Sequence, residues 1–186
     1  MPTLAYTLFP TALGHCGIAW SALGLTGVQL PERDEAATRA RMAQRHPHCA
    51  QAAPPPWLST AIDAVSALLC GAPRAQATMP ADLSDLVLDL RGVPPFHQRV
   101  YALTRRLGPG QTISYGELAQ QLGQPGAARA VGQALGANPF APVVPCHRVL
   151  AARSGAGGFS ASGGVNTKLR LLLAEHAQFN GPGLFD

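Results

Sequence analysis

The sequence pattern of this 186-residue chain changes at Arg91-Gly92-Val93-Pro94-Pro95, and that change constrains the fold more than any other feature. Before it, short β-forming runs accompany one polar and one apolar helical segment. After it, short helical segments follow one another, and glycine or proline ends each of them. We therefore expect an α/β domain over residues 1–92 and a mainly α-helical domain over residues 93–186.

The N-terminal domain is predicted to be a small sheet with flanking helix. Strands are expected at residues 4–9, 17–20, 27–30 and 86–90, and a polar, arginine-rich helix at residues 34–45. A second helix presents an apolar face made of Ile62, Val65, Leu68 and Leu69. This half contains no group of residues that predicts catalysis.

The C-terminal domain is predicted to contain a helix-turn-helix. A first helix has an apolar stripe made of Phe96, Val100, Leu103 and Leu107, and it is expected to end at Gly108-Pro109-Gly110. Ser114 and Glu117 have the spacing of a capping box, which starts a helix that reaches about Leu122. After a glycine- and proline-rich turn, another helix is expected at residues 127–135, which completes the motif.

The outward face of that last helix is nearly bare. It presents two long polar side chains, Arg129 and Gln133, beside the small residues Ala128 and Gly132. Helices that read base edges usually carry several long polar side chains, because readout needs paired donors and acceptors. This helix therefore suits a close approach to a widened minor groove, with Arg129 as the single probe into the base stack. The alternative is that the small residues only permit helix packing.

Composition narrows the class of protein. Hydrophobic residues make up 47% and charged residues 13%, which excludes disorder. The sequence contains no run of about 20 apolar residues, so it does not suggest a membrane protein. We expect a cytoplasmic protein, because no export signal is evident. The net charge of +4 fits a polyanionic partner. The four cysteines are expected to be free thiols, and their spacing predicts no metal site.

Cys146 is the candidate nucleophile. It lies in a proline-stiffened, apolar stretch beside His147, which could act as its base, and Arg148. A thiol attacks as its thiolate, which nearby positive charge or a base favours. On an extended backbone neighbouring side chains point to opposite sides, so we expect a bridging water rather than a direct Cys146–His147 hydrogen bond. From the pair alone, the alternative of an inert buried thiol beside an unrelated histidine is favoured.

Five ordered blocks of sequence carry a family resemblance. They are Ser114-Tyr115-Gly116-Glu117-Leu118-Ala119, Ala128-Arg129-Ala130-Val131-Gly132, Asn138-Pro139, Pro145-Cys146-His147-Arg148-Val149, and the tail from Gly158 to Glu175. Together they resemble the O6-alkylguanine-DNA alkyltransferases, also called methylated-DNA–protein-cysteine methyltransferases. The resemblance covers the C-terminal half in detail and the N-terminal half only loosely. It implies a ribonuclease H-like N-terminal domain and a winged helix-turn-helix-like motif in the C-terminal domain.

The resemblance also implies roles for individual residues. Cys146 matches the alkyl acceptor, His147 its water-mediated base, Glu175 the carboxylate that orients the histidine, and Asn138 a brace of the loop. Taken alone, Glu175 would be a solvated surface charge. Arg148 and Pro145 are expected to be structural. The groove-facing and DNA-contacting residues implied are Tyr115, Ala128, Arg129, Gly132 and Gln133, and the residues implied to line the alkyl pocket are Tyr115, Val149, Phe159 and Ser160.

The implied function is DNA repair by a single-use reaction. Double-stranded DNA with O6-alkylguanine is bound through the minor groove with little sequence specificity, and the sequence leaves open whether O4-alkylthymine is also accepted. The nucleotide is flipped out, and Cys146 takes the alkyl group irreversibly. We expect a monomer that needs no cofactor and binds no membrane. The family's usual tyrosine in the tail is Phe159 here, with extra small residues around it, which leaves the accepted alkyl sizes open.

Three other functions fit parts of the sequence. A lesion sensor related to the alkyltransferases would lack the acceptor thiol, so Cys146 argues against it. A helix-turn-helix transcription regulator would carry long polar residues where Ala128 and Gly132 stand. A Cys-His-Glu hydrolase would need an oxyanion hole and repeated turnover.

Overall fold

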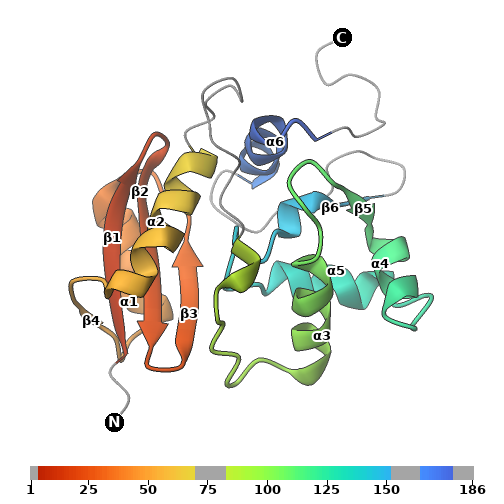
Figure 1. Cartoon of the computed structure of the whole chain (residues 1–186), viewed down its shortest axis with the longest axis horizontal. Helices are drawn as coiled ribbons and strands as arrows, with labels where there is room; N and C mark the ends of the chain where they lie inside the picture. Colours follow the sequence, from red (N-terminus) through yellow and green to blue (C-terminus); the bar gives the residue numbers. More distant parts are fainter. Residues whose placement is uncertain (1–3, 70–82, 152–163, 178–186) are drawn as a thin grey trace. The chain divides into compact units, whose positions relative to one another are not determined.

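The computed structural model describes residues 4–69, 83–151 and 164–177 (Figure 1). The chain divides into two compact units, which are described separately. The first unit comprises Met1–Arg91 together with Pro139–Val143, and the second comprises Gly92–Asn138 together with Val144–Asp186. The short segment Pro139–Val143 therefore belongs to the first unit although it lies between two elements of the second.

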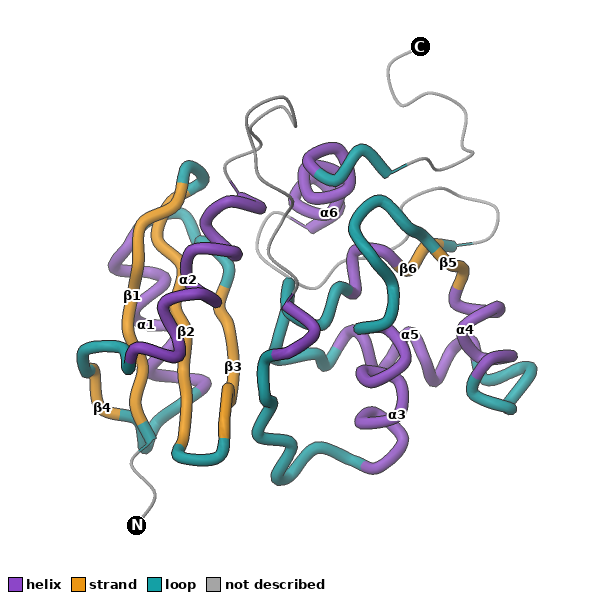
Figure 2. The backbone as a smooth tube through the Cα atoms, viewed as in Figure 1, coloured by secondary structure: helices purple, strands orange, loops and turns teal. Residues whose placement is uncertain are grey.

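A four-stranded mixed sheet forms the centre of the first unit. Its strands are β1 (Ala5–Thr11), β2 (Gly14–Ser21), β3 (Gly24–Gln29) and β4 (Ala50–Gln51), and they lie in the order β3-β2-β1-β4 (Figure 2). The pairs β1–β2 and β2–β3 are antiparallel, whereas β4 runs parallel to β1. The three expected N-terminal strands are confirmed. Gly24 has a φ of +140°, and a side chain there would collide with the carbonyl of Val87.

Two helices cover the two faces of this sheet (Figure 1). Helix α1 (Glu35–Arg45) begins at the N-cap Asp34, whose side chain accepts from the amide of Ala37 at 2.7 Å. Its Met42 packs with Tyr6 and Ala19 of the sheet. Helix α2 (Pro56–Leu69) packs against β1. Both helices agree with the sequence prediction.

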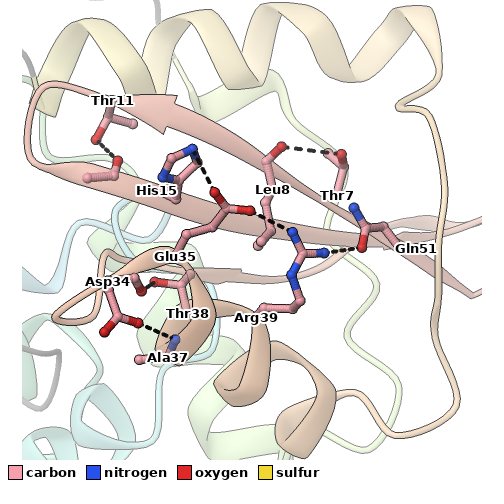
Figure 3. Close-up of polar contacts among 11 residues, drawn as sticks. Thr7, Leu8, Thr11, His15, Asp34, Glu35, Ala37, Thr38, Arg39 and Gln51 are labelled. Carbon is pink, nitrogen blue, oxygen red and sulfur yellow. Dashed lines mark hydrogen bonds and ion pairs between the residues drawn. The ribbon is translucent and has the colours of Figure 1, made fainter.

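Exposed polar side chains of α1 contact residues of β2 and β4 (Figure 3). Glu35 lies 3.4 Å from His15 of β2 and 2.6 Å from Arg39, which also donates to the side chain of Gln51 in β4. Surface ion pairs of this kind contribute about 0–1 kcal/mol each. They help to orient α1 on the sheet, and nothing in their arrangement suggests chemistry.

The expected strand at residues 86–90 is wrong. Only Leu88 makes a β-bridge, with Leu25, and a 3-10 helix η1 (Leu83–Asp85) precedes it. The buried carboxylate of Asp89 accepts from Ser21 Oγ at 2.7 Å and from Arg91 Nε at 2.8 Å. A short polar side chain that bonds its own surroundings competes with a regular ladder, so the chain makes one bridge and then turns away.

The described residues of the second unit form short helices and one small parallel pair of strands. Its elements are α3 (Pro95–Thr104), β5 (Ile113–Ser114), α4 (Tyr115–Gln121), α5 (Ala128–Gly136), the 3-10 helix η2 (Cys146–Arg148), β6 (Val149–Leu150) and α6 (Gly164–Ala174). Strand β5 pairs with β6 in parallel, and α5 packs against both α3 and α4. The mainly helical character of this half agrees with the prediction.

Helix α3 is shorter than predicted and buries a different face. It ends at Thr104, and its buried residues are Val100, Tyr101 and Thr104, whereas Leu103 and Leu107 are only half-buried. The hydroxyl of Thr104 donates to the carbonyl of Val100 at 2.8 Å, a back-bond that bends and weakens a helix. The amides of Arg106 and Leu107 then bond carbonyls three residues back, so the chain tightens before Gly108.

The structure confirms, to within about a residue, where the two helices of the predicted helix-turn-helix begin and end. Ser114 accepts from the amide of Glu117 at 3.1 Å, and the Glu117 carboxylate accepts from the amide of Ser114 at 2.8 Å, which completes the capping box of α4. Gly123 (φ +71°) and Gly126 (φ +98°) shape the turn before α5. Within the described ranges, no helix combines the length and apolar character needed to span a bilayer.

Candidate active site

Cys146 begins a single turn of 3-10 helix, which corrects the expected extended backbone. The amide of Arg148 donates to the carbonyl of Pro145 at 2.9 Å, and that of Cys146 to Val144 at 2.8 Å. With about three residues per turn, neighbouring side chains diverge by about 120°. Cys146 and His147 therefore point in different directions, and each finds its own partners.

Glu175 is the polar centre of this site. It lies just after α6, and its carboxylate accepts from Gly110 N at 3.3 Å and from Arg148 through Nε at 2.8 Å and Nη2 at 2.6 Å. His147 Nε2 lies 3.0 Å away. Burial alone would raise the pKa of Glu175, but the hydrogen bonds from His147 and Arg148 outweigh it and lower that pKa to about 2. The carboxylate is therefore buried and charged, which excludes a solvated surface glutamate.

His147 is held as a neutral imidazole. Its side chain has no exposed area, and burial lowers its pKa, although the Glu175 carboxylate opposes this effect. Because Nε2 faces a carboxylate, the proton of the neutral ring belongs on Nε2. The lone pair of Nδ1 then remains, and this buried atom has no hydrogen-bond partner among the described residues. Such a nitrogen can accept a proton.

Arg148 links Glu175 to the segment between α3 and β5. Besides its paired hydrogen bonds to Glu175, its Nη1 donates to the carbonyl of Leu107, between α3 and β5. The side chain is 12% exposed, so both ends of the ion pair are largely removed from water. This geometry suits the structural role that the sequence analysis expected for Arg148.

Cys146 itself is 7% exposed and has two stabilising neighbours. Burial raises the pKa of its thiol, while a hydrogen bond with Asn138 and the charge of Lys168 act in the opposite direction. Asn138 Nδ2 also donates to the carbonyl of Val144 at 2.9 Å, across the loop that leads to Cys146. The amide thus connects the end of α5 to the start of η2.

Lys168 is the functional candidate that sequence reasoning missed. It lies on α6, has no exposed area, and donates to the carbonyl of Val149 at 2.6 Å. Its ammonium also lies 5.8 Å from the ring centroid of Tyr115, the first residue of α4. Burial lowers the pKa of Lys168 to about 8, while Cys146 opposes the shift. One signal was present in the sequence, because this is its only lysine.

Of the residues expected to meet DNA, Tyr115 begins α4 and the other four lie on α5. On α5, Arg129 and Gln133 are exposed, and Ala128 and Gly132 are half-buried. Gly132 is not required by packing, because a Cβ there would lie 3.9 Å from the Tyr115 ring, an ordinary contact. The opposite face buries Val131, Ala134 and Leu135, as the helical pattern predicted.

The expected pocket residues are only partly described. Val149 is buried in β6, next to η2, and Tyr115 lies near Lys168. Phe159 and Ser160 lie outside the described residues. The thiols of Cys16, Cys49 and Cys146 are free, and the described ranges contain no group of three His, Cys, Asp or Glu residues suited to a metal ion.

Comparison with known proteins identifies the family of this chain. Residues 95–177 match the family described as "6-O-methylguanine DNA methyltransferase, DNA binding domain". The methylated-DNA–protein-cysteine methyltransferase of Salmonella typhimurium is 43% identical over 119 residues, which cover 56% of this chain and 68% of that protein. The chain therefore belongs to the methylated-DNA–protein-cysteine methyltransferase family.

Two matches from Mycobacterium tuberculosis extend the comparison. The Mycobacterium tuberculosis methyltransferase is 50% identical over 94 residues, so the match spans 50% of this chain and only 55% of that relative. A crystal structure of Mycobacterium tuberculosis OGT in complex with DNA superposes with a TM-score of 0.68 at 35% identity, covering 92% of each chain. The likeness therefore extends into the first unit, where the sequence resemblance was loose.

Proposed function

We propose that this chain repairs alkylated DNA by transferring the alkyl group from O6 of guanine to the sulfur of Cys146, once per molecule. The observation that carries this proposal is the position of the thiol. It begins a 3-10 turn that also carries a neutral histidine, whose Nδ1 has no partner among the described residues, and the charge of the buried Lys168 acts on the thiol. Relatives that share this family are named for the same transfer to cysteine.

In the proposed reaction the thiol proton passes to His147 through a water, and Glu175 stabilises the imidazolium that forms. The sulfur then attacks the alkyl carbon, so an S–C bond forms and the C–O6 bond breaks. The electron pair of that bond stays on guanine, which takes a proton from Tyr115. The Tyr115 phenolate then regains a proton from water, and the His147 imidazolium releases one to water. Burial raises the pKa of Tyr115, which keeps its hydroxyl protonated until the leaving base needs it. The product is a thioether, and a thioether does not regenerate the thiol.

DNA recognition follows from the same proposal. The target guanine has to leave the duplex, because O6 inside the helix cannot be aligned with a protein sulfur. Arg129 would fill the space of the flipped nucleotide, and Ala128, Gly132 and Gln133 would meet the minor groove. A crystal structure of a family relative is described as a complex with DNA, which supports a DNA partner. Asn138 would keep the loop before Cys146 in place, and Val149, Phe159 and Ser160 would line the alkyl pocket.

The finer points of architecture belong to the proposal as well. We infer a ribonuclease H-like fold for an N-terminal domain over residues 1–92, supported by the strand order β3-β2-β1-β4. The capped helix α4, the helix α5 and the β5–β6 pair support a winged helix-turn-helix-like motif over residues 93–186. We also propose a monomer located in the cytoplasm. Sedimentation of the free protein tests the monomer directly.

Intact-mass measurement after mixing with a duplex that contains O6-methylguanine tests the transfer. The expected result is the gain of one methyl group per chain, mapped to Cys146 by peptide analysis and absent in Cys146→Ala. Gain at another residue, or repeated turnover with unmodified Cys146, would contradict the proposal. A lesion sensor would bind the duplex without any mass change, so binding and mass measured together separate these two functions.

A further inference from the structure

Lys168 occupies an unusual position for a cation. It is fully buried, and the described residues offer it one hydrogen bond, from Nζ to the carbonyl of Val149, and the ring of Tyr115. A buried ammonium with so few partners is costly unless a negative charge lies nearby. The other cations of this sequence are arginines, and arginine cannot lose its proton or act as a compact point charge. Lysine can do both, so the one lysine of the sequence occupies a position where a compact charge that can lose its proton is useful.

The charges around Lys168 leave one candidate anion. The carboxylate of Glu175 is already bonded by Arg148, His147 and Gly110. His147 is kept neutral by burial, so it supplies no permanent positive charge to the sulfur. The remaining titratable groups that interact with this cluster are the phenols of Tyr101 on α3 and Tyr115 on α4, and burial raises the pKa of both. Only the sulfur of Cys146 is left to balance the ammonium within the described residues.

We propose that Lys168 is a positioning residue for the alkyl transfer, because its ammonium is the counter-ion of the Cys146 thiolate. This inference rests on the proposed function and adds a role to it. His147 removes the proton, Asn138 bonds the sulfur, and Lys168 balances the charge that the sulfur acquires. Its hydrogen bond to Val149, the residue after η2, holds the ammonium next to the turn that carries Cys146.

Alkylation then changes the state of Lys168. When the S–C bond forms, the thiolate becomes a neutral thioether, and the ammonium loses its counter-ion without moving. A buried cation without an anion gives up its proton more easily, so the pKa of Lys168 should fall further in the alkylated protein. Alkylated and free protein thus differ in the charge of one buried group, although the transferred group itself is uncharged.

The first test uses iodoacetamide, an uncharged reagent that reports thiolate without any DNA. Its rate of reaction at Cys146, resolved from other cysteines by peptide mapping, is measured against pH in wild type, Lys168→Met and Lys168→Arg. Loss of an adjacent opposite charge shifts a pKa by about 1–3 units. Lys168→Met should therefore raise the apparent pKa of Cys146 and slow the reaction at about pH 7 by about tenfold or more. Lys168→Arg should restore only part of that loss, because it keeps the positive charge but not the compact ammonium.

A purely structural lysine would give a different result. Thermal stability would fall in Lys168→Met, while the apparent pKa of the thiol would stay at its wild-type value, and that outcome overturns the proposal. Methyl transfer from duplex DNA is measured on the same samples. A wild-type protein that takes no methyl group refutes the proposed function, whatever the iodoacetamide profile shows. Normal methyl transfer with an unmoved profile refutes only the role of Lys168.

A second measurement needs no variant, so it decides the question if Lys168→Met does not fold. Protein grown with ε-carbon-labelled lysine has one lysine signal, because the sequence contains one lysine. Its pKa is read by NMR titration before and after Cys146 is converted to the neutral carboxamidomethyl thioether. A fall of about one unit or more is expected. An unchanged pKa would overturn the counter-ion role.

Discussion

His147 Nε2 and Glu175 Oε1 lie 3.0 Å apart, and neither side chain is exposed. The two residues are separated by 28 positions in the sequence. Glu175 also holds Arg148, so one carboxylate sets both the orientation of the imidazole and the position of the turn that carries Cys146. Substitution of this carboxylate should therefore affect stability and reactivity together.

Glu175→Gln should lower the stability of the protein and slow methyl transfer. The Arg148 guanidinium keeps its partly buried position but loses its anion, and breaking such a pair costs on the order of 3 kcal/mol. The neutral amide also cannot stabilise an imidazolium, so methyl transfer should slow on the order of 100-fold. Thermal melting and single-turnover rates measure the two effects. Glu117→Gln, an exposed capping-box glutamate, is the matched control and should change both very little. Wild-type rates for Glu175→Gln would contradict the role of the carboxylate.

The stability of the protein should depend on Glu175 at acid pH. Its pKa is lowered to about 2 in the folded state, below the value of about 4.3 in an unfolded chain. The folded state therefore binds fewer protons in that range, and the stabilisation is complete above about pH 5 and lost as the pH falls towards 2. Thermal midpoints at a series of pH values should show a steeper acid loss in wild type than in Glu175→Gln. Parallel curves would show that the carboxyl is not charged and buried as described.

Gly132→Ala should separate folding from DNA binding. An added Cβ meets only the Tyr115 ring at 3.9 Å, and alanine favours a helix by about 1 kcal/mol over glycine. Stability should rise, while affinity for a duplex falls because the methyl group stands between α5 and the groove. Gly132→Val should weaken binding further. Ser66→Ala in α2, which also raises helix propensity, is the control and should leave duplex affinity unchanged. Unchanged affinity in Gly132→Ala would contradict the groove-facing role of this surface of α5.

Arg129→Ala should impair transfer from duplex DNA more than transfer from a free O6-alkylguanine base. Arg129 is exposed, so its removal leaves the fold intact, but flipping a nucleotide costs a few kcal/mol that it is proposed to offset. The duplex rate should fall about tenfold or more, which corresponds to about 1.4 kcal/mol of that cost. Single-turnover rates on both substrates give the ratio. Arg170→Ala removes another exposed charge, from α6, and controls for general electrostatics. An equal loss on both substrates would argue against a role in flipping.

The sequence alone was sufficient where the physics is local. The capping box of Ser114 and Glu117, the glycine-containing turn before α5, and the two faces of α5 each depend on residues within one or two helical turns, so spacing predicted them. The same holds for the first three strands and for α1. Cys146 was identified as the acceptor through the five ordered blocks of the family resemblance, whereas the Cys146–His147 pair alone favoured an inert thiol.

Other features were decided only by contacts between distant parts of the chain. Asp89 bonds Ser21 and turns the chain away from the expected strand, and Thr104 shortens α3. Glu175 becomes a buried, charged partner of His147, and Lys168 is buried where its charge acts on the thiol of Cys146. Burial removes water from these charges, and without water their energies depend on which groups the fold brings within a few ångströms. Spacing along the chain carries no measure of that distance, so the charge state of the site was settled by the tertiary structure.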